Sequence, residues 1–442
     1  MNSHLKFAIL ISFASACTDS RASARPNPSS ADPSSADPGA AVVVAWNRRL
    51  VGIAQAEDHF LTLKGLRALA MMHLAVHDAL NAIRPRYAAY AYRMQADGAD
   101  PSAAVARAAY EVVAHEYPNV NAELETELAA WLAPLPEGPA KSSGNALGRA
   151  AAAEILKVRQ GDGWDAEGEY QLQPAGPGVY RAFPEHSGTP PGFVFGSGWG
   201  RARPFLLREA QQFRPAPPPA IDGTAYAAAF AEVKELGRLD SPTRTEEQTH
   251  IAFWWKDFAE NSLNRLAAQS APRPLDLWAS ARLFALLNAS IFDGYVSAFE
   301  SKFHYNHWRP YTAIRAAASD GNPSTAPDPN WDDTHQHTYP FPSYPSAHGT
   351  VCAAGLRVFE NVFGDAQPFR MTTLQVNAAG PMSPLLRMEP AERSFERFSA
   401  AARECALSRV YLGIHFRHDA EAGTELGTLV AQYAWDHFLQ PK

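Results

Sequence analysis

The sequence predicts an all-α protein made of helical bundles, and three observations indicate this. Helical signals dominate the chain from about residue 41 to its end. That length is sufficient for one large core or for two closely packed bundles of the four-helix type. Residues 161–222 are instead rich in Gly, Pro and aromatic residues, which predicts a long irregular loop over the bundles.

The helices follow from the apolar periodicity and are expected, in chain order, at residues 42–55, 65–83, 101–117, 122–132, 141–160, 225–236, 244–258, 275–317, 349–364 and 390–438. The two longest must break internally, because few helices of globular proteins exceed about 25 residues. Arg309-Pro310 is expected to interrupt the first of them, since proline cannot continue a helix. The irregular loop at 161–222 is of the kind that often shapes a substrate entrance.

Residues 1–24 are expected to form a signal segment. Lys6 precedes an apolar run over residues 7–16 that is too short to span a membrane as a mature helix. Two cleavage sites compete: residues 14–17 resemble a bacterial lipobox ending at Cys17, and residues 22–24 offer an Ala-x-Ala site. Either site predicts export, to the periplasm, to the outer membrane as a lipoprotein, or out of the cell.

The next segment, residues 25–40, is rich in Ser, Pro and Ala and predicts a flexible tether, because this composition cannot bury a core. A tether directly after a cysteine favours the lipoprotein, with membrane attachment through lipidated Cys17. Residues 41–442 are then expected to form a single all-α domain, whose motifs lie at 293–423. The sequence specifies no oligomeric state.

Charge and cysteines restrict the partners. The formal net charge is −7 and no basic stripe is present, which argues against nucleic acid. Cys352 and Cys405 lie in predicted helices near the motifs. A disulfide between them is one alternative in an oxidising compartment, but both lie among apolar residues and we expect buried thiols.

Three clusters of basic residues and histidines carry the chemistry. They are Lys302-x6-Arg309-Pro310, Pro345-Ser346-Ala347-His348-Gly349 and Ser408-Arg409-x5-His415-x3-Asp419. A lysine point charge and two forked arginine side chains suit the charged oxygens of one tetrahedral or trigonal oxyanion. Two histidines add a nucleophile or metal ligand and a proton donor. The clusters therefore predict a cage for a single oxyanion.

The spacing within the clusters mostly supports this cage. Lys302 and Arg309 are seven residues apart, which places them on one helical face over two turns. His415 and Asp419 are four apart, so Asp419 is expected to accept the Nδ1 proton of His415 and leave Nε2 reactive. Arg409 lies six residues before His415, which requires a break in the helix or the reach of the long arginine side chain.

Together the motifs resemble the shared signature of vanadium-dependent haloperoxidases and type 2 phosphatidic-acid phosphatases, K-x6-R-P, P-S-G-H and S-R-x5-H-x3-D. The one departure is Ala347, where the family usually has Gly. Alanine keeps the backbone amide, but it would be strained if that backbone needed a positive φ. The resemblance covers roughly residues 293–423, and the region upstream resembles bacterial haloperoxidase-like members more loosely.

This resemblance implies a role for each matching residue. His415 stands where the peroxidases bind vanadium through Nε2 and the phosphatases form a phosphohistidine. His348 matches the acid–base histidine. The residues that match the donors to the oxyanion are Lys302, Arg309, Ser346, Ala347 through its amide, and Arg409.

Two enzyme classes fit these roles. The first is a peroxidase that uses vanadate, hydrogen peroxide and halide, with Lys302 polarising the peroxide; the second is an acid phosphatase that acts on a phosphate monoester through His415. The phosphatases are commonly integral membrane proteins, and this chain has no apolar span beyond its N-terminus. Its length and Phe341, which resembles fungal-type chloroperoxidases at that position, also favour the peroxidase. A non-enzymatic oxyanion-binding lipoprotein is disfavoured, because both reactive histidines are present.

Several other polar residues have competing interpretations. His73 and His77 have the i, i+4 spacing of a zinc helix, but Leu74 replaces the expected Glu, and satisfied core histidines are the better interpretation. Asp293 either anchors Arg309 or Lys302 or lies on a helix surface. Asp257 is a candidate partner of an arginine.

Three further histidines lie near the motifs. His335 and His337 are expected at a loop surface, with a site entrance as the alternative. His418 has no counterpart in the motifs and is expected to be structural.

Overall fold

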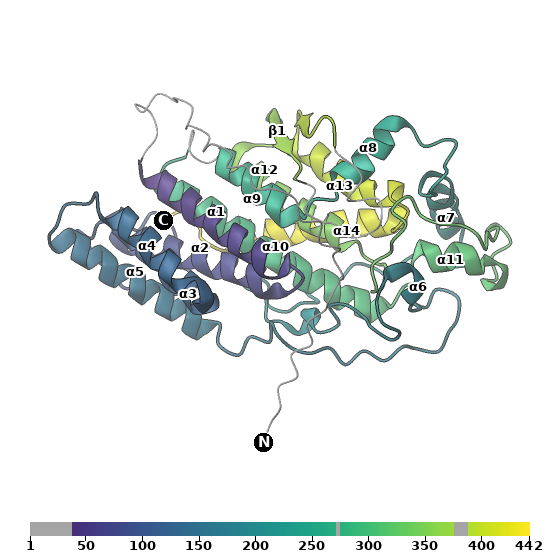
Figure 1. Ribbon diagram of the computed structural model, residues 1–442, viewed down its shortest axis with the longest axis horizontal. Helices are drawn as coiled ribbons and strands as arrows, with labels where there is room; N and C mark the ends of the chain where they lie inside the picture. The colour runs from purple at the N-terminus through teal and green to yellow at the C-terminus, as the bar shows by residue number, and fades with distance from the viewer. Residues whose placement is uncertain (1–37, 271–274, 375–387) are drawn as a thin grey trace, which may run out of the picture. The chain divides into compact units, whose positions relative to one another are not determined.

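The computed structural model describes residues 38–270, 275–374 and 388–442. The predicted signal segment, Cys17 and most of the predicted tether lie outside these residues. Within them the all-α prediction is confirmed, because helices form the body of the protein and the named strands are one short antiparallel pair (Figure 1).

The first five α-helices form one group. They are α1 (Pro38–Asp58), α2 (Leu63–Ile83), α3 (Pro101–Glu116), α4 (Asn121–Leu132) and α5 (Pro139–Val158), with the short 3₁₀ turn η1 (Pro118–Val120) before α4. α2 packs against α3 and α5, and α1 contacts both α2 and α3 (Figure 1). The Asp100 side chain caps α3 by accepting from the amide of Ala103 at 2.8 Å, directly before Pro101 at the first helical position. The helical start at Pro38 falls inside the segment expected to be a tether.

The chain then crosses the bundles irregularly, as predicted, with only α6 (Pro184–Ser187) and the 3₁₀ turn η2 (Trp199–Arg201) as helical pieces. Asp293, fully buried, fixes this loop. Its carboxylate accepts from the backbone amides of Phe205, Leu206 and Leu207 at 2.6–2.9 Å. Both expectations for Asp293 are therefore wrong: it neither anchors a basic residue of the cage nor lies at a surface.

The central element is α10 (Leu277–Tyr305), which packs against α2 on one side and α12 on the other. Most of its residues are buried around the whole circumference, as in a helix enclosed by others. It ends at Tyr305, because Asn306 has a left-handed backbone (φ 52°), and α11 (Pro310–Ala316) starts separately. The expectation that Lys302 and Arg309 share one helical face is therefore wrong.

The remaining elements build the second group. They are α7 (Thr224–Leu236), α8 (Glu246–Trp254), α9 (Ala259–Ser270), η3 (Ala317–Ser319), α12 (Ala347–Phe363), β1 (Phe369–Thr372), β2 (Glu392–Phe395), α13 (Phe398–Tyr411) and α14 (Arg417–His437). The strands pair antiparallel with Phe369 opposite Phe395. The predicted break of the last long helix is confirmed, and it lies between α13 and α14. Helix α9 and the strand pair were not predicted.

Helices α12 and α14 approach each other closely because of two glycines. A Cβ atom on Gly423 would lie 2.4 Å from the carbonyl oxygen of Ser346, and one on Gly427 would lie 2.0 Å from that of Thr350. Only glycine permits this separation. The close packing brings the start of α12 next to the start of α14.

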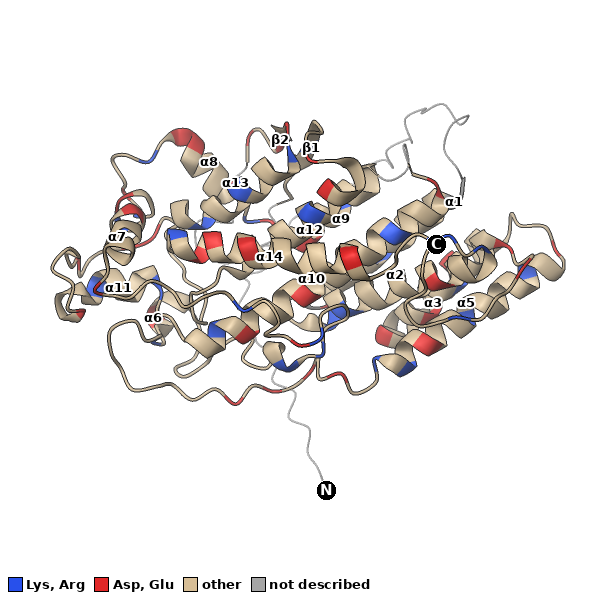
Figure 2. Ribbon diagram, turned by 180° about the vertical axis from the view of Figure 1, so that it is seen from behind, with Lys and Arg blue, Asp and Glu red and all other residues tan. Residues whose placement is uncertain are grey.

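One hydrophobic core runs through both groups. Leu69 of α2, Phe284 and Phe292 of α10 and Leu356 of α12 belong to the same buried cluster. Basic and acidic side chains are interspersed along the helices (Figure 2). Among the described residues, no helix is both long enough and apolar enough to cross a bilayer.

The end of the chain returns to the first helical group. Tyr87 and Pro441 form an antiparallel bridge, and the amide of Ala88 donates to the carbonyl of Gln440 at 2.8 Å. The amide of Lys442 donates to the carbonyl of Arg86 at 3.0 Å. The last residues after α14 are therefore fixed against the loop after α2.

His73 and His77 are fully buried in α2, as predicted for core histidines. His73 Nε2 lies 2.8 Å from Asn47 Oδ1, and its ring stacks on Phe284. His77 Nε2 lies 3.1 Å from the carbonyl oxygen of Ala88. The Nδ1 atom of each ring has no partner among the described residues, so only half of the ring nitrogens are satisfied. Burial lowers the pKa of His73 to about 3.

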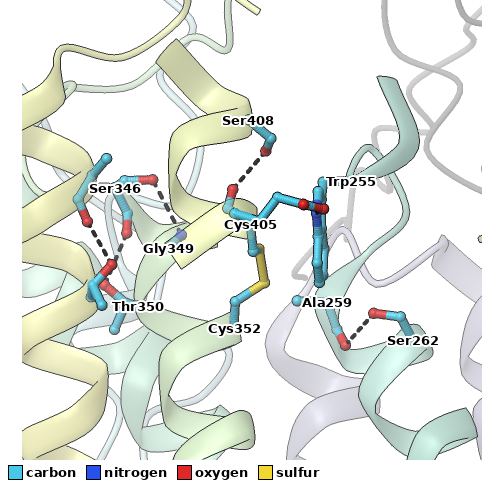
Figure 3. Close-up of a disulfide and its surroundings, with 12 residues drawn as sticks. Trp255, Ala259, Ser262, Ser346, Gly349, Thr350, Cys352, Cys405 and Ser408 are labelled. Atoms are coloured by element: carbon cyan, nitrogen blue, oxygen red, sulfur yellow. Dashed lines mark hydrogen bonds between the residues drawn. A yellow bond between two sulfur atoms is a disulfide. The ribbon is translucent and has the colours of Figure 1, made fainter. Parts of the chain in front are cut away.

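Cys352 and Cys405 form a disulfide that joins α12 to α13 (Figure 3). The expectation of two buried thiols is therefore wrong. Apolar surroundings are compatible with either state, and the two helices bring the Cα atoms to 6.5 Å, within the range that a disulfide spans. The bond fixes the helix whose first turn contains His348 to the helix whose last turn contains Arg409.

Replacing both cysteines with serine should lower the free energy of unfolding by about 2–4 kcal/mol, because the disulfide closes a long loop in the unfolded chain. Chemical denaturation of both proteins without reductant measures this difference. Alkylation of both cysteines in unreduced, denatured wild-type protein would contradict the disulfide.

The stability of the folded protein should fall as the pH drops below about 6.5. The unfolded chain then takes up a proton at His73, whereas the folded state, with its pKa near 3, does not. His73→Phe should therefore reduce the slope of stability against pH between about 6.5 and 4 by up to about 1.4 kcal/mol per pH unit. Denaturation curves across this range, with exposed His437→Phe as the control, measure the effect. Parallel pH profiles for wild type and His73→Phe would contradict it.

Candidate active site

Four segments bring the predicted cage residues together. Lys302 lies in the last turn of α10, and Arg309 directly precedes α11. Ser346 and His348 stand at the start of α12, and Arg409 is in the last turn of α13. His415 lies in the connection to α14, and Asp419 is in the first turn of that helix. All of them are buried except His348, which is partly exposed.

Arg309 is the residue that contacts His415 directly. Its Nη1 lies 3.1 Å from His415 Nε2 and donates to the carbonyl of Ile414 at 2.8 Å. Its Nε donates to the carbonyl of Phe341 at 2.8 Å, and the Phe341 ring lies 4.7 Å from the guanidinium carbon. Burial lowers the pKa of Arg309 to about 10, which leaves it cationic at neutral pH. The hypothesis of an oxyanion cage requires Arg309 and His415 to lie this close together.

Lys302 is held by the loop between α11 and α12. Its Nζ donates to the carbonyls of Pro342 at 3.0 Å and Ser343 at 2.7 Å, and lies 5.1 Å from the ring of Phe341. The pKa of Lys302 lies well below its usual value, mainly because of burial and next because of the charge of Arg309. The charge of Asp419 acts in the opposite direction. An ammonium has three donors, so one N–H remains beyond the two carbonyl contacts.

Asp419 orients His415, as predicted, although His415 precedes the helix. Asp419 Oδ2 lies 2.9 Å from His415 Nδ1 and also accepts from the Phe416 amide at 3.1 Å and from the Ser343 hydroxyl. Burial alone would raise the pKa of Asp419, but the hydrogen bond from His415 and nearby histidines hold it below its ordinary value. An ionised Asp419 fixes the proton of His415 on Nδ1 and leaves the lone pair on Nε2.

The start of α12 is formed by Ser346 and Ala347. Ser346 Oγ accepts from the amide of Gly349 at 3.2 Å and so caps the helix. Ala347 is the first helical residue and does not have a positive φ. The alanine at this position is therefore not strained, and the loop geometry that its presence put in question is retained.

His348 and Arg409 complete the cage. The pKa of His348 lies well below its usual value, mainly because of burial and next because of the charge of Arg409. A hydrogen bond with the backbone of Trp255 acts in the opposite direction. A ring nitrogen of His348 lies within 4.8 Å of the sulfur atoms of the disulfide. The predicted break between Arg409 and His415 is confirmed, since α13 ends at Tyr411.

Four donor atoms at this site are buried and have no partner within the described ranges. They are Arg309 Nη2, Arg409 Nε, Arg409 Nη1 and His348 Nε2 when that atom is protonated. A buried polar group without a partner costs about 1–3 kcal/mol, and more if it is charged. An oxyanion would satisfy several of these donors together. The residues present therefore fit an anion such as vanadate or phosphate.

Sequence reasoning missed two residues around this site. Ser343 contacts Asp419, and Lys256, which is 2 % exposed, lies close enough for the charge of Arg409 to affect it. Burial, followed by Arg409, lowers the pKa of Lys256 to about 7, while Asp333 raises it. Neither residue has a diagnostic spacing from the motifs. The signal for Lys256 was its place beside Asp257 among aromatic residues at a predicted helix end.

The loop-surface expectation was wrong for His335, whereas the expected pairing of Asp257 with an arginine was confirmed. His335 is fully buried and His337 is partly buried, because the loop folds around Asp333, which accepts from the amide of His337 at 3.2 Å and from the Thr338 hydroxyl at 2.8 Å. They therefore do not form a loop surface. Asp257 does pair with an arginine, but the partner is Arg265 rather than a cage residue.

The chain is similar to known vanadium-dependent haloperoxidases. The family model described as the VCPO second helical-bundle domain matches residues 282–441. The vanadium chloroperoxidase of Curvularia inaequalis is 23% identical over 460 residues, covering 81% of this chain and 75% of that protein.

Two solved structures show the same fold. The first bacterial vanadium-dependent iodoperoxidase superposes with a TM-score of 0.68 at 24% identity, covering 91% of this chain and 98% of that chain. A holo-type bacterial vanadium-dependent chloroperoxidase superposes with a TM-score of 0.62 at 17% identity, covering 84% and 90%. Residues 282–441 therefore match the VCPO second helical-bundle domain, and the predicted resemblance of the chain to vanadium-dependent haloperoxidases is confirmed.

Proposed function

We propose that this protein is a vanadate-dependent haloperoxidase that oxidises halide with hydrogen peroxide. The observation that carries the proposal is the group of unpartnered donors on Arg309 and Arg409, together with the unpartnered Nε2 atom of His348, near the Nε2 atom of His415. No group in the described protein accepts a hydrogen bond from these donor atoms, whereas the oxygens of vanadate would accept one from each. The similarity to proteins named chloroperoxidase and iodoperoxidase supports the same reaction class.

The residues of the cage would have separate roles in binding vanadate. His415 would bind vanadium through Nε2, because Asp419 holds the proton on Nδ1. Bound vanadate would supply a Lewis-acidic centre that activates hydrogen peroxide for attack by halide without changing its oxidation state. The charged oxygens would be held by Lys302, Arg309, Arg409, the Ser346 hydroxyl and the Ala347 amide.

His348 would act as the acid–base residue that transfers a proton of hydrogen peroxide. Its lowered pKa makes the imidazole neutral at physiological pH, and its Nε2 atom has no partner among the described residues. A neutral imidazole can take a proton from hydrogen peroxide at Nε2 and return it to the departing oxygen. The remaining N–H of Lys302 would polarise the peroxide oxygen that the halide attacks.

The alternative is an acid phosphatase, because phosphate and vanadate have nearly the same shape and charge. The lone pair on His415 Nε2 could attack phosphorus and form a phosphohistidine, with His348 protonating the leaving alkoxide. The geometry around Asp419 serves either reaction. The two classes therefore have to be separated by activity.

We also propose export of the protein, with membrane attachment through lipidated Cys17. The disulfide between Cys352 and Cys405 supports an oxidising compartment. Mass analysis of protein from its native host would distinguish a lipidated cysteine from cleavage after an Ala-x-Ala site.

Alanine variants should separate the roles of the two histidines. His415→Ala should abolish vanadate binding, because it removes the only proposed protein–vanadium bond. His348→Ala should lower kcat more than it weakens vanadate binding. Calorimetric titration with vanadate and steady-state kinetics measure these effects, with His437→Ala as the exposed control and circular dichroism as the check on folding. Equal loss of vanadate affinity in both folded variants would contradict the assignment.

Reconstitution should separate the enzyme classes. Apo-protein given vanadate and hydrogen peroxide should oxidise iodide or bromide, and added phosphate should suppress this activity by competing for the same cage. Chloride belongs in the assay too, because the relatives are named for chloride and for iodide.

A different result would identify the protein as a phosphatase. If vanadate only inhibits robust hydrolysis of phosphate monoesters, with no halide oxidation between about pH 4 and 8, where histidines titrate, the protein is a phosphatase.

A further inference from the structure

Three groups of histidine, cysteine or acidic residues among the described residues have potential metal-ligating atoms within 4.8 Å of one another. In the first, the sulfur atoms of Cys352 and Cys405 are already bonded to each other. In the second, His186 Nε2 lies 2.7 Å from Asp333, so the pair is satisfied. The third group, His307, His418 and Asp419, differs from both because each of its three side chains has a buried atom without a partner among the described residues.

The unpartnered atoms of this third group are numerous for so small a volume. His307 is 3 % exposed and its Nε2 has no hydrogen-bond partner within the described chain. The same holds for both ring nitrogens of His418 and for Oδ1 of the fully buried Asp419. The other carboxylate oxygen, Oδ2, is occupied by His415, Ser343 and the Phe416 amide. Oδ1 is therefore the atom that Asp419 offers to a ligand.

The distance between two of these ligand atoms suits a tetrahedral metal ion. His418 Nε2 lies 3.4 Å from Asp419 Oδ1, without hydrogen-bond geometry. Two ligand atoms about 2.0–2.1 Å from a tetrahedral ion are separated by about 3.4 Å, which agrees with the observed distance. A single buried water could satisfy only part of the four unpartnered atoms, whereas a cation takes one lone pair from each of the three side chains.

The surroundings also favour a bound ion. The His418 ring stacks on Phe416 with 5.0 Å between centroids, and the rings of Tyr226 and Tyr344 lie 6.1–6.4 Å from it. These contacts fix the imidazole orientation, as metal sites require.

We propose that His307, His418 and Asp419 form a second metal site, which binds a borderline divalent cation such as Zn²⁺ or Co²⁺. Two imidazole nitrogens and one carboxylate oxygen are the ligands that these ions prefer, and a water molecule would take the fourth position. The site is distinct from the oxyanion cage, although Asp419 belongs to both. It does not depend on whether the cage binds vanadate or phosphate.

Cobalt titration tests the proposal with a readout independent of activity. Untagged, full-length protein is stripped with a chelator and titrated with Co²⁺ in the absence of vanadate and peroxide. We expect one Co²⁺ per chain with the intense visible absorption of a tetrahedral site, and displacement of that signal by Zn²⁺. His307→Phe and His418→Phe, which keep an aromatic ring, should each weaken Co²⁺ binding by more than about tenfold. His437→Phe, which alters an exposed histidine, should have no effect.

Two outcomes would overturn the proposal. One is wild-type protein without a tetrahedral Co²⁺ signal, which would mean that the cluster holds only water. The other is an unchanged signal in both folded phenylalanine variants, which would place the ion elsewhere. If a variant does not fold, a crystal of the wild type soaked with Co²⁺ decides the matter. Anomalous scattering must then show a peak between the three side chains, and its absence would contradict the site.

Discussion

The constraint on which the site depends is the burial of three cations around a single carboxylate. Lys302, Arg309 and Arg409 are 0–4% exposed, and Asp419 is the acidic group that acts on the first two. Buried charges are costly unless they are paired or hydrogen-bonded. Backbone carbonyls of the loop before α12 accept from Lys302 and Arg309, and so offset part of this cost. The excess of positive charge that remains suits the site to an anion.

The helices hold this excess in place through a few strong constraints. α10 is enclosed by both helical groups, so its last turn, which carries Lys302, has a fixed position. The close contact of α12 with α14 depends on Gly423 and Gly427, and the disulfide ties α12 to α13. A site that must present several donors to one small ion needs such rigidity, because a displacement of about 1 Å is enough to lose a hydrogen bond.

The sequence predicted the chemistry better than the local geometry. The fold class, most helices and the contact of His415 with Asp419 followed from periodicity and motif spacing, which are local properties. The prediction failed where tertiary contacts decide the outcome. Asn306 ends α10 before Arg309, Asp293 binds a loop some ninety residues earlier in the chain, and His335 is buried in a folded loop. The contact of Asp293 joins residues that are distant in sequence, and no spacing rule identifies such a contact.

The return of the chain end to residues 86–88 bears on how this architecture can evolve. The region that matches the family model, residues 282–441, corresponds to the second bundle. Its first helix is buried against α2, and its last residues pair with the loop after that same helix. The matched region is therefore not a unit that could be transplanted alone. Recombination at its boundary would expose the apolar surface of α10 and leave backbone groups at both ends without partners, so the two halves are expected to be inherited together.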